Sequence, residues 1–113
     1  MNNFQKNINL KINDWKNKLN DYNSDEIIIW GSGSKCVSFI TTLKINSLVK
    51  AVIDINPYRH GYYLPSIGHK IVNPEYLIDN KPELLLIMNS IYEKEIKDMV
   101  KNMGISTNII SLN

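Results

Sequence analysis

Cysteine, histidine and long apolar runs are scarce in this chain of 113 residues. Cys36 is the only cysteine and two histidines accompany it, which excludes an internal disulfide and argues against a structural metal site. The longest apolar run, residues 84–88, is far shorter than the roughly 20 residues that a membrane-spanning helix needs. The first residues also lack the apolar stretch of a secretory signal. We therefore expect no bound metal, no membrane partner and a cytoplasmic location.

A strong excess of one charge is missing as well. Thirteen Lys and Arg residues face 11 Asp and Glu residues, for a net charge of +2, and the basic residues are scattered along the chain. This distribution argues against a nucleic acid partner. Hydrophobic residues make up 43% of the chain, which is ordinary for a folded protein, and the length fits one domain.

The first 22 residues carry apolar side chains at spacings of three and four. This spacing predicts an amphipathic N-terminal helix that packs on the domain or on a partner. Turn-forming residues follow at 20–24, so we place the helix and its linker in residues 1–24 and a folded domain in residues 25–113. The apolar positions are Phe4, Ile8, Ile12, Trp15, Leu19 and Tyr22.

Short apolar runs alternate with helical spacing in the rest of the chain. The runs predict strands at 27–30, 49–53, 71–72, 84–88 and 108–112, with helices after Gly33, near 74–78 and from Ser90 onward. Strands that alternate with helices favour a parallel sheet covered on both faces. The sequence thus predicts an α/β fold, a small Rossmann-like three-layer domain with a mostly parallel sheet.

Two helix starts carry capping signals. Asn73 precedes Pro74, which suits a cap followed by the first helical residue. Ser90 and Glu93 have the spacing of a capping box. Gly104 is expected to end the last helix in a left-handed conformation.

Polar segments follow three of the predicted strands, at the edge where parallel sheets bind ligands. Glycines, the amides of a helix N-terminus and Lys35 suit a phosphate, although Cys36 replaces the third glycine of the dinucleotide fingerprint. Asp54 is 21 residues after Gly33, a position that suits a ribose hydroxyl. The alternatives are a tight turn with a solvated lysine and a carboxylate that binds loop amides. The candidate ligand-binding residues are Gly31, Ser32, Gly33, Ser34, Lys35, Asp54, Asn56, Asn89 and Tyr92.

Candidates for acid or base chemistry are few. His60, His69 and Tyr92 are weak candidates, because a lone loop histidine is more often solvated than catalytic and geometry must be shown first. Cys36, at a helix start, is interpreted as a small packing residue rather than a nucleophile.

Several ordered segments resemble the C-terminal domain of sugar C-methyltransferases that use S-adenosylmethionine, especially those acting on nucleotide-linked deoxysugars. The resemblance covers about residues 26–112, and departures are Cys36 and Ser66 where glycine is usual and Ser90 where proline is usual. The matching segments are 29–35 (IWGSGSK), 52–58 (VIDINPY), 61–65 (GYYLP), 68–75 (GHKIVNPE) and 89–96 (NSIYEKEI).

The resemblance implies that substrate binding and catalysis are carried out by different domains. In that family this domain is the last part of a longer enzyme, whose preceding domains bind zinc and S-adenosylmethionine and carry the main catalytic groups. This chain is then expected to bind a nucleotide-sugar, to hold no cofactor by itself, and to need a separate S-adenosylmethionine-binding subunit for methyl transfer.

Two other hypotheses for the function of this sequence remain. One is a minimal enzyme that binds a nucleotide cofactor such as NAD and uses His60, His69 or a tyrosine as acid or base. The other is an interaction or oligomerisation module with a vestigial ligand site, in which residues 4–22 dock on a partner or form a homodimer.

Overall fold

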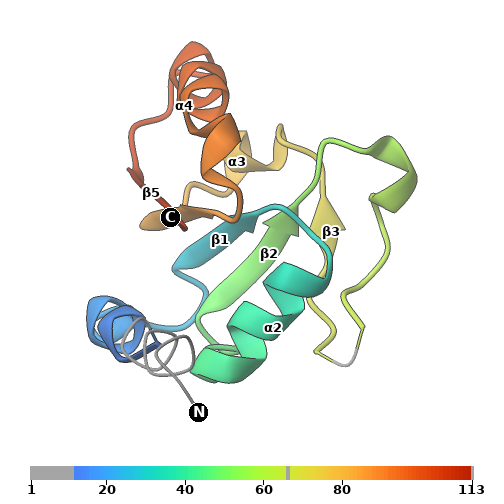
Figure 1. Ribbon diagram of the computed structural model, residues 1–113. Coiled ribbons are helices and arrows are strands. Elements are labelled where there is room, and N and C mark those ends of the chain that lie inside the picture. The colour runs from blue at the N-terminus through green and yellow to red at the C-terminus, as the bar shows by residue number, and fades with distance from the viewer. Residues whose placement is uncertain (1–11, 66, 113) are drawn as a thin grey trace.

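The sheet of this protein contains five parallel strands within the described part of the chain. A computed structural model describes residues 12–65 and 67–112 (Figure 1). The strand order is β3-β2-β1-β4-β5 and each neighbouring pair is parallel. The predicted Rossmann-like α/β fold is confirmed, with strands close to the predicted runs. Their bounds are β1 (Ile27–Trp30), β2 (Val49–Ile53), β3 (Ile71–Val72), β4 (Leu84–Ile87) and β5 (Asn108–Ser111).

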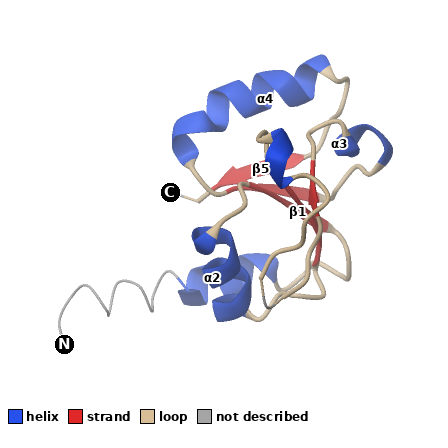
Figure 2. Ribbon diagram, turned by 90° about the vertical axis from the view of Figure 1, so that its right-hand side faces the viewer, coloured by secondary structure: helices blue, strands red, loops and turns tan. Residues whose placement is uncertain are grey.

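Helices cover both faces of the sheet. One face packs α2 (Ser34–Leu43) and the N-terminal helix, which is described over 12–19, while the other packs α3 (Tyr76–Asp79) and α4 (Glu93–Asn102) (Figures 1 and 2). Successive strand side chains point to opposite faces, so Ile27 and Ile29 join the core on the α2 side and Ile28 joins the core on the α4 side. The three layers therefore enclose two apolar cores.

The described part of the N-terminal helix packs on the domain. Leu19 is 2% exposed within the core under α2. Trp15 meets Phe39 of α2 edge to face, with ring centroids 5.5 Å apart. The predicted apolar positions Phe4 and Ile8 lie outside the described residues.

The predicted Asn73 cap is wrong, although its helix is present, and the helix expected from Ser90 onward begins as an α-helix at Glu93. Residues 74–75 form a turn and α3 begins at Tyr76, whose N–H donates to the Asn73 carbonyl at 3.1 Å. Before α4, a 3₁₀ turn at Ser90–Tyr92 is capped by the Asn89 side chain. The Glu93 carboxylate accepts from Lys97 and Ser111. The predicted left-handed Gly104 after α4 is confirmed, with φ at 76°.

The chain changes direction across the sheet at β1. From β1 it continues to β2 and β3 on one side, and then crosses to β4 and β5 on the other. Helices on opposite faces diverge at such a switch point, which opens a crevice at the carboxyl ends of β1 and β4. Among the described residues, no helix is long and apolar enough to cross a membrane.

Candidate ligand-binding site

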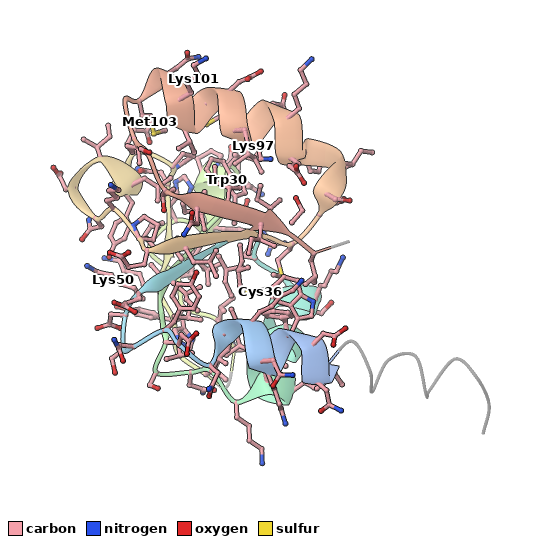
Figure 3. The ribbon with its side chains drawn as sticks, turned by 90° about the vertical axis from the view of Figure 1, so that its left-hand side faces the viewer. Trp30, Cys36, Lys50, Lys97, Lys101 and Met103 are labelled. Atoms are coloured by element: carbon pink, nitrogen blue, oxygen red, sulfur yellow. The ribbon has the colours of Figure 1, made fainter. Side chains whose placement is uncertain are left out.

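A cleft of about 540 Å³ lies at this switch point, on the α4 side of the sheet. Trp30 forms part of its wall and lies between the sheet and α4 (Figure 3). The cleft brings together six of the nine predicted ligand-binding residues, whereas Gly33, Ser34 and Asn56 are not in its lining. The lining residues are Trp30, Gly31, Ser32, Lys35, Asp54, Ile55, Ile87, Met88, Asn89, Tyr92, Glu95, Ile96 and Met99.

The turn after β1 requires glycine at its first position. Gly31 has φ at 123°, and a Cβ there would lie 3.0 Å from Cβ of Met88. Its N–H donates to the Ile53 carbonyl at 2.8 Å, which fixes the turn against β2. A side chain at this position would therefore be strained and would collide with the segment after β4.

α2 begins directly after this turn. Gly33 is its N-cap residue, with φ at 118° and no side-chain capping bond. The first amides of an α-helix have no acceptor within the helix, and they carry the positive end of its dipole. Lys35, in the first turn, adds a full positive charge to the same side of the cleft. This arrangement suits an anion such as a phosphate.

Asp54 is the centre of a hydrogen-bonded network after β2. One carboxylate oxygen accepts from the Asn56 N–H at 2.8 Å, and the other accepts from the Ser32 hydroxyl. Arg59 completes the network, with Nε 3.8 Å from the Asp54 carboxylate and Nη1 donating to the Ser32 hydroxyl at 3.2 Å. The Asp54 side chain is 16% exposed, so it borders the cleft while it ties the β1 and β2 loops together.

The two asparagines after the strands act locally as caps. The Asn56 side chain accepts from the Tyr58 N–H at 3.0 Å, and the Asn89 side chain accepts from the Ile91 N–H at 3.2 Å. Asn89 still lines the cleft. Its amide group is thus held in one orientation at the rim.

The two histidines do not line the cleft. The His60 ring hydrogen-bonds to the backbone carbonyl of Asp54. His69 lies beyond the other end of β2, where its Nε2 is 2.8 Å from the Asn46 carbonyl. Of the three weak candidates for acid or base chemistry, only Tyr92 borders the cleft.

Cys36 packs as a small apolar side chain under the turn. It is fully buried, and burial raises the pKa of its thiol to about 12. A neutral thiol is a poor nucleophile. Across residues 12–65 and 67–112, no group of three or more His, Cys, Asp or Glu side chains is placed to hold a metal ion.

Several residues of this region were not predicted from the sequence, and Glu95, Met99 and Arg59 are among them. Glu95 and Met99 of α4 line the cleft, and they follow Tyr92 at spacings of three and four, a helical pattern that links them to a predicted site residue. Arg59 binds Asp54 across the loop after β2, and no local pattern indicates that pairing.

A second cavity, of about 630 Å³, lies on the opposite face between the N-terminal helix and α2. Trp15 and Phe39 form its aromatic wall, and Lys18 Nζ lies 4.7 Å from the centre of the Trp15 ring. Lys35 is the one predicted site residue that lines it. The predicted constellation therefore belongs to the cleft under α4.

Comparison with known proteins agrees with this architecture. Among solved structures, the chain is similar to RSP, a Rex-family repressor, with a TM-score of 0.57 and 16% sequence identity. The match covers 89% of this chain and 58% of the repressor chain. This likeness supports the fold alone. No curated protein matches the chain. The family model of the C-methyltransferase C-terminal domain matches residues 1–109, and the chain therefore belongs to that family.

Proposed function

We propose that this domain binds a nucleotide-sugar in the cleft under α4 and supplies it to a separate domain that binds S-adenosylmethionine. The observation that carries the proposal is the convergence of Lys35, Asn89 and Tyr92 on one cleft at the switch point of the sheet, which Asp54 borders. Ligands of open α/β sheets bind at this place. The cleft volume also falls in the range of small-molecule sites, roughly 300–1,000 Å³.

The phosphate end of the ligand belongs at the first turn of α2. Ser32 and Lys35 line the cleft on one side, and the Lys35 ammonium with the first amides of α2 would neutralise a diphosphate. Gly31 has no side chain, so a bound phosphate could lie close to the backbone of this turn.

Polar and apolar groups on the other side suit a sugar and a base. Glu95 and the Asn89 amide offer hydrogen-bonding groups for hydroxyls, and Trp30 and Met99 offer apolar surface for a ring. Tyr92 is 52% exposed at the rim, where its ring is available for stacking on a ligand.

The same residues are a poor match for an adenosine cofactor. An acid after the second strand commonly binds ribose hydroxyls, whereas Asp54 uses both carboxylate oxygens to hold the β1 and β2 loops together through Ser32 and Asn56. We therefore place S-adenosylmethionine, which supplies the methyl group when bound, in a partner domain. Exposed Ile55 and Ile91, at 67% and 77%, flank the cleft and offer apolar surface to such a partner.

Calorimetric titration of the chain with a dTDP-sugar tests the proposal. Lys35→Met is expected to weaken binding on the order of tenfold or more, because a charge-assisted bond to phosphate is lost. Lys50→Met is the matched control, because it removes the same charge from an exposed position of β2 outside the cleft. Equal effects of the two substitutions, or no binding to the unmodified chain, would reject the proposal.

A further inference from the structure

The two edges of the sheet differ in how their outer backbone groups are paired. At the β3 edge, the Ile71 N–H donates to the Tyr62 carbonyl at 2.8 Å, and the Ile71 carbonyl accepts from the Gly61 N–H at 2.9 Å. The loop before β3 thus covers that edge. At the opposite edge, β4 is the strand paired with β5 in the described sheet.

The outer edge of β5 is suited to accept another strand. The Leu112 N–H donates to the Ile87 carbonyl of β4 at 2.8 Å. Because backbone groups alternate in direction along a strand, those of Ile109 and Ser111 point away from β4. β5 also lacks the charges and prolines with which natural edge strands prevent pairing. Figure 3 shows β5 at the front of the sheet, between α4 and the N-terminal helix.

We propose that β5 pairs with β5 of a second copy of this chain, antiparallel and across a two-fold axis through Ile110. This register pairs Ile109 of each copy with Ser111 of the other, so the backbone groups that point away from β4 gain partners. Ile110 then faces Ile110 of the second copy at a position without backbone bonds, where side chains approach closely. Each Ile110 is partly buried and packs against the core on the α2 side of its own copy.

The charged side chains of Glu93 and Lys97 on α4 are also arranged so that they can pair across this two-fold axis. Lys97 Nζ lies 2.8 Å from the Glu93 carboxylate, which also accepts from the Ser111 hydroxyl. Four residues of an α-helix span about 6 Å along its axis, which is about the length of two residues of a strand. Glu93 contacts Ser111, so Lys97, four residues later, lies near residue 109 of β5. The two-fold axis places residue 109 of one copy opposite residue 111 of the other. Glu93 of each copy therefore faces Lys97 of the other.

The spacing between the two α4 helices is also suitable. α4 connects β4 to β5, so we place its axis about half a strand spacing from β5. Two copies joined through β5 would then hold their α4 helices about 10 Å apart, near the 8–10 Å of packed helices. An unrelated strand would satisfy the backbone of β5, but only a second copy brings the complementary charges of α4.

Sedimentation velocity of the full chain, from micromolar to millimolar concentration, tests this interface. We expect a species of twice the 13.0 kDa chain mass. Lys97→Glu should raise the dimer dissociation constant on the order of tenfold, since two attractive contacts become repulsive. Exposed Lys94 provides the matched control, because Lys94→Glu makes the same charge change in α4. The double variant Glu93→Lys with Lys97→Glu should restore the dimer.

A second variant tests the backbone pairing without changing charge. Ile109→Pro removes an N–H that points away from β4, and should give a monomer with an unchanged circular dichroism spectrum. A single-chain mass at every concentration would overturn the proposal. A dimer that survives in Ile109→Pro, or one that Lys94→Glu and Lys97→Glu weaken equally, would overturn it too.

Discussion

The backbone at Gly31, in the turn after β1, lies close to Met88 in the segment after β4. A single methyl group added at Gly31 would disturb both segments. Gly31→Ala places a Cβ 3.0 Å from Cβ of Met88 at a φ of 123°. Gly33→Ala has a similar φ, 118°, but meets nothing within 4 Å. Backbone strain alone costs roughly 1–3 kcal/mol. We predict by urea unfolding that both variants are destabilised and that Gly31→Ala loses more. Equal losses would mean that the Met88 contact is unimportant.

Other single residues show what a local pattern can and cannot reveal. Cys36 was predicted to pack, because small apolar side chains suit a helix start beneath a sheet, and it is buried. The link between Asp54 and Arg59 was not predictable. It depends on the course of the loop after β2, which the types of the residues do not determine.

Among the elements, strands were easier to predict than helix ends. Apolar β-branched runs have few alternatives to a buried strand, and β1 and β2 have the predicted bounds. The start of α4 shows a contact that local spacing does not predict. Ser111, 18 residues away, lies within reach of Glu93 once β5 is in place, and a local spacing rule does not include such a contact.

The interactions of Glu93 make the anchoring of α4 to β5 dependent on pH. Hydrogen bonds from Lys97 and Ser111 lower the pKa of Glu93 below its ordinary value of 4.5. The stabilisation is therefore complete above that value and is lost as the pH falls through the lowered pKa. Glu93→Gln should melt at a lower temperature than the unmodified chain at neutral pH, and the gap should close in acid.

Glu95→Gln is the control for this prediction, because it removes a carboxylate from the same first turn of α4. Thermal melts followed by circular dichroism, from neutral to acidic pH, compare the two variants. If Glu95→Gln shows the same pH-dependent gap, the bonds of Glu93 to Ser111 and Lys97 are not its cause.

The N-terminal helix contributes to the core through Leu19. Its side chain is 2% exposed among residues of α2 and the sheet, so Leu19→Ala should lower the free energy of unfolding by about 2–5 kcal/mol. Exposed Asn17 is the comparison, and Asn17→Ala should change little. Urea denaturation measures both. An effect below 1 kcal/mol for Leu19→Ala, about the scale of a surface substitution, would show that this helix is not part of the cooperative unit.

At the scale of the whole molecule, the order of elements determined where the candidate site would form. Alternating strands and helices predicted a parallel sheet, and ligand sites of such sheets lie beyond the carboxyl ends of the strands. Gly31, Asp54 and Asn89, from three separate segments, meet in one cleft for this reason. The lining residues from α4, which are Glu95, Ile96 and Met99, were missed because the side of a helix that faces the crevice depends on how it crosses the sheet.

An amide-resolved NMR titration tests the central claim, that the cleft recognises a nucleotide-sugar, most directly. The chain is titrated separately with dTDP, a dTDP-sugar, S-adenosylmethionine and NAD. We predict saturable shifts at residues 31–35, 54–58 and 89–92 with the dTDP-sugar, and none with S-adenosylmethionine or NAD. Shifts with NAD would favour a minimal nucleotide-binding enzyme. No shift with any ligand at millimolar concentration would contradict ligand recognition by this domain.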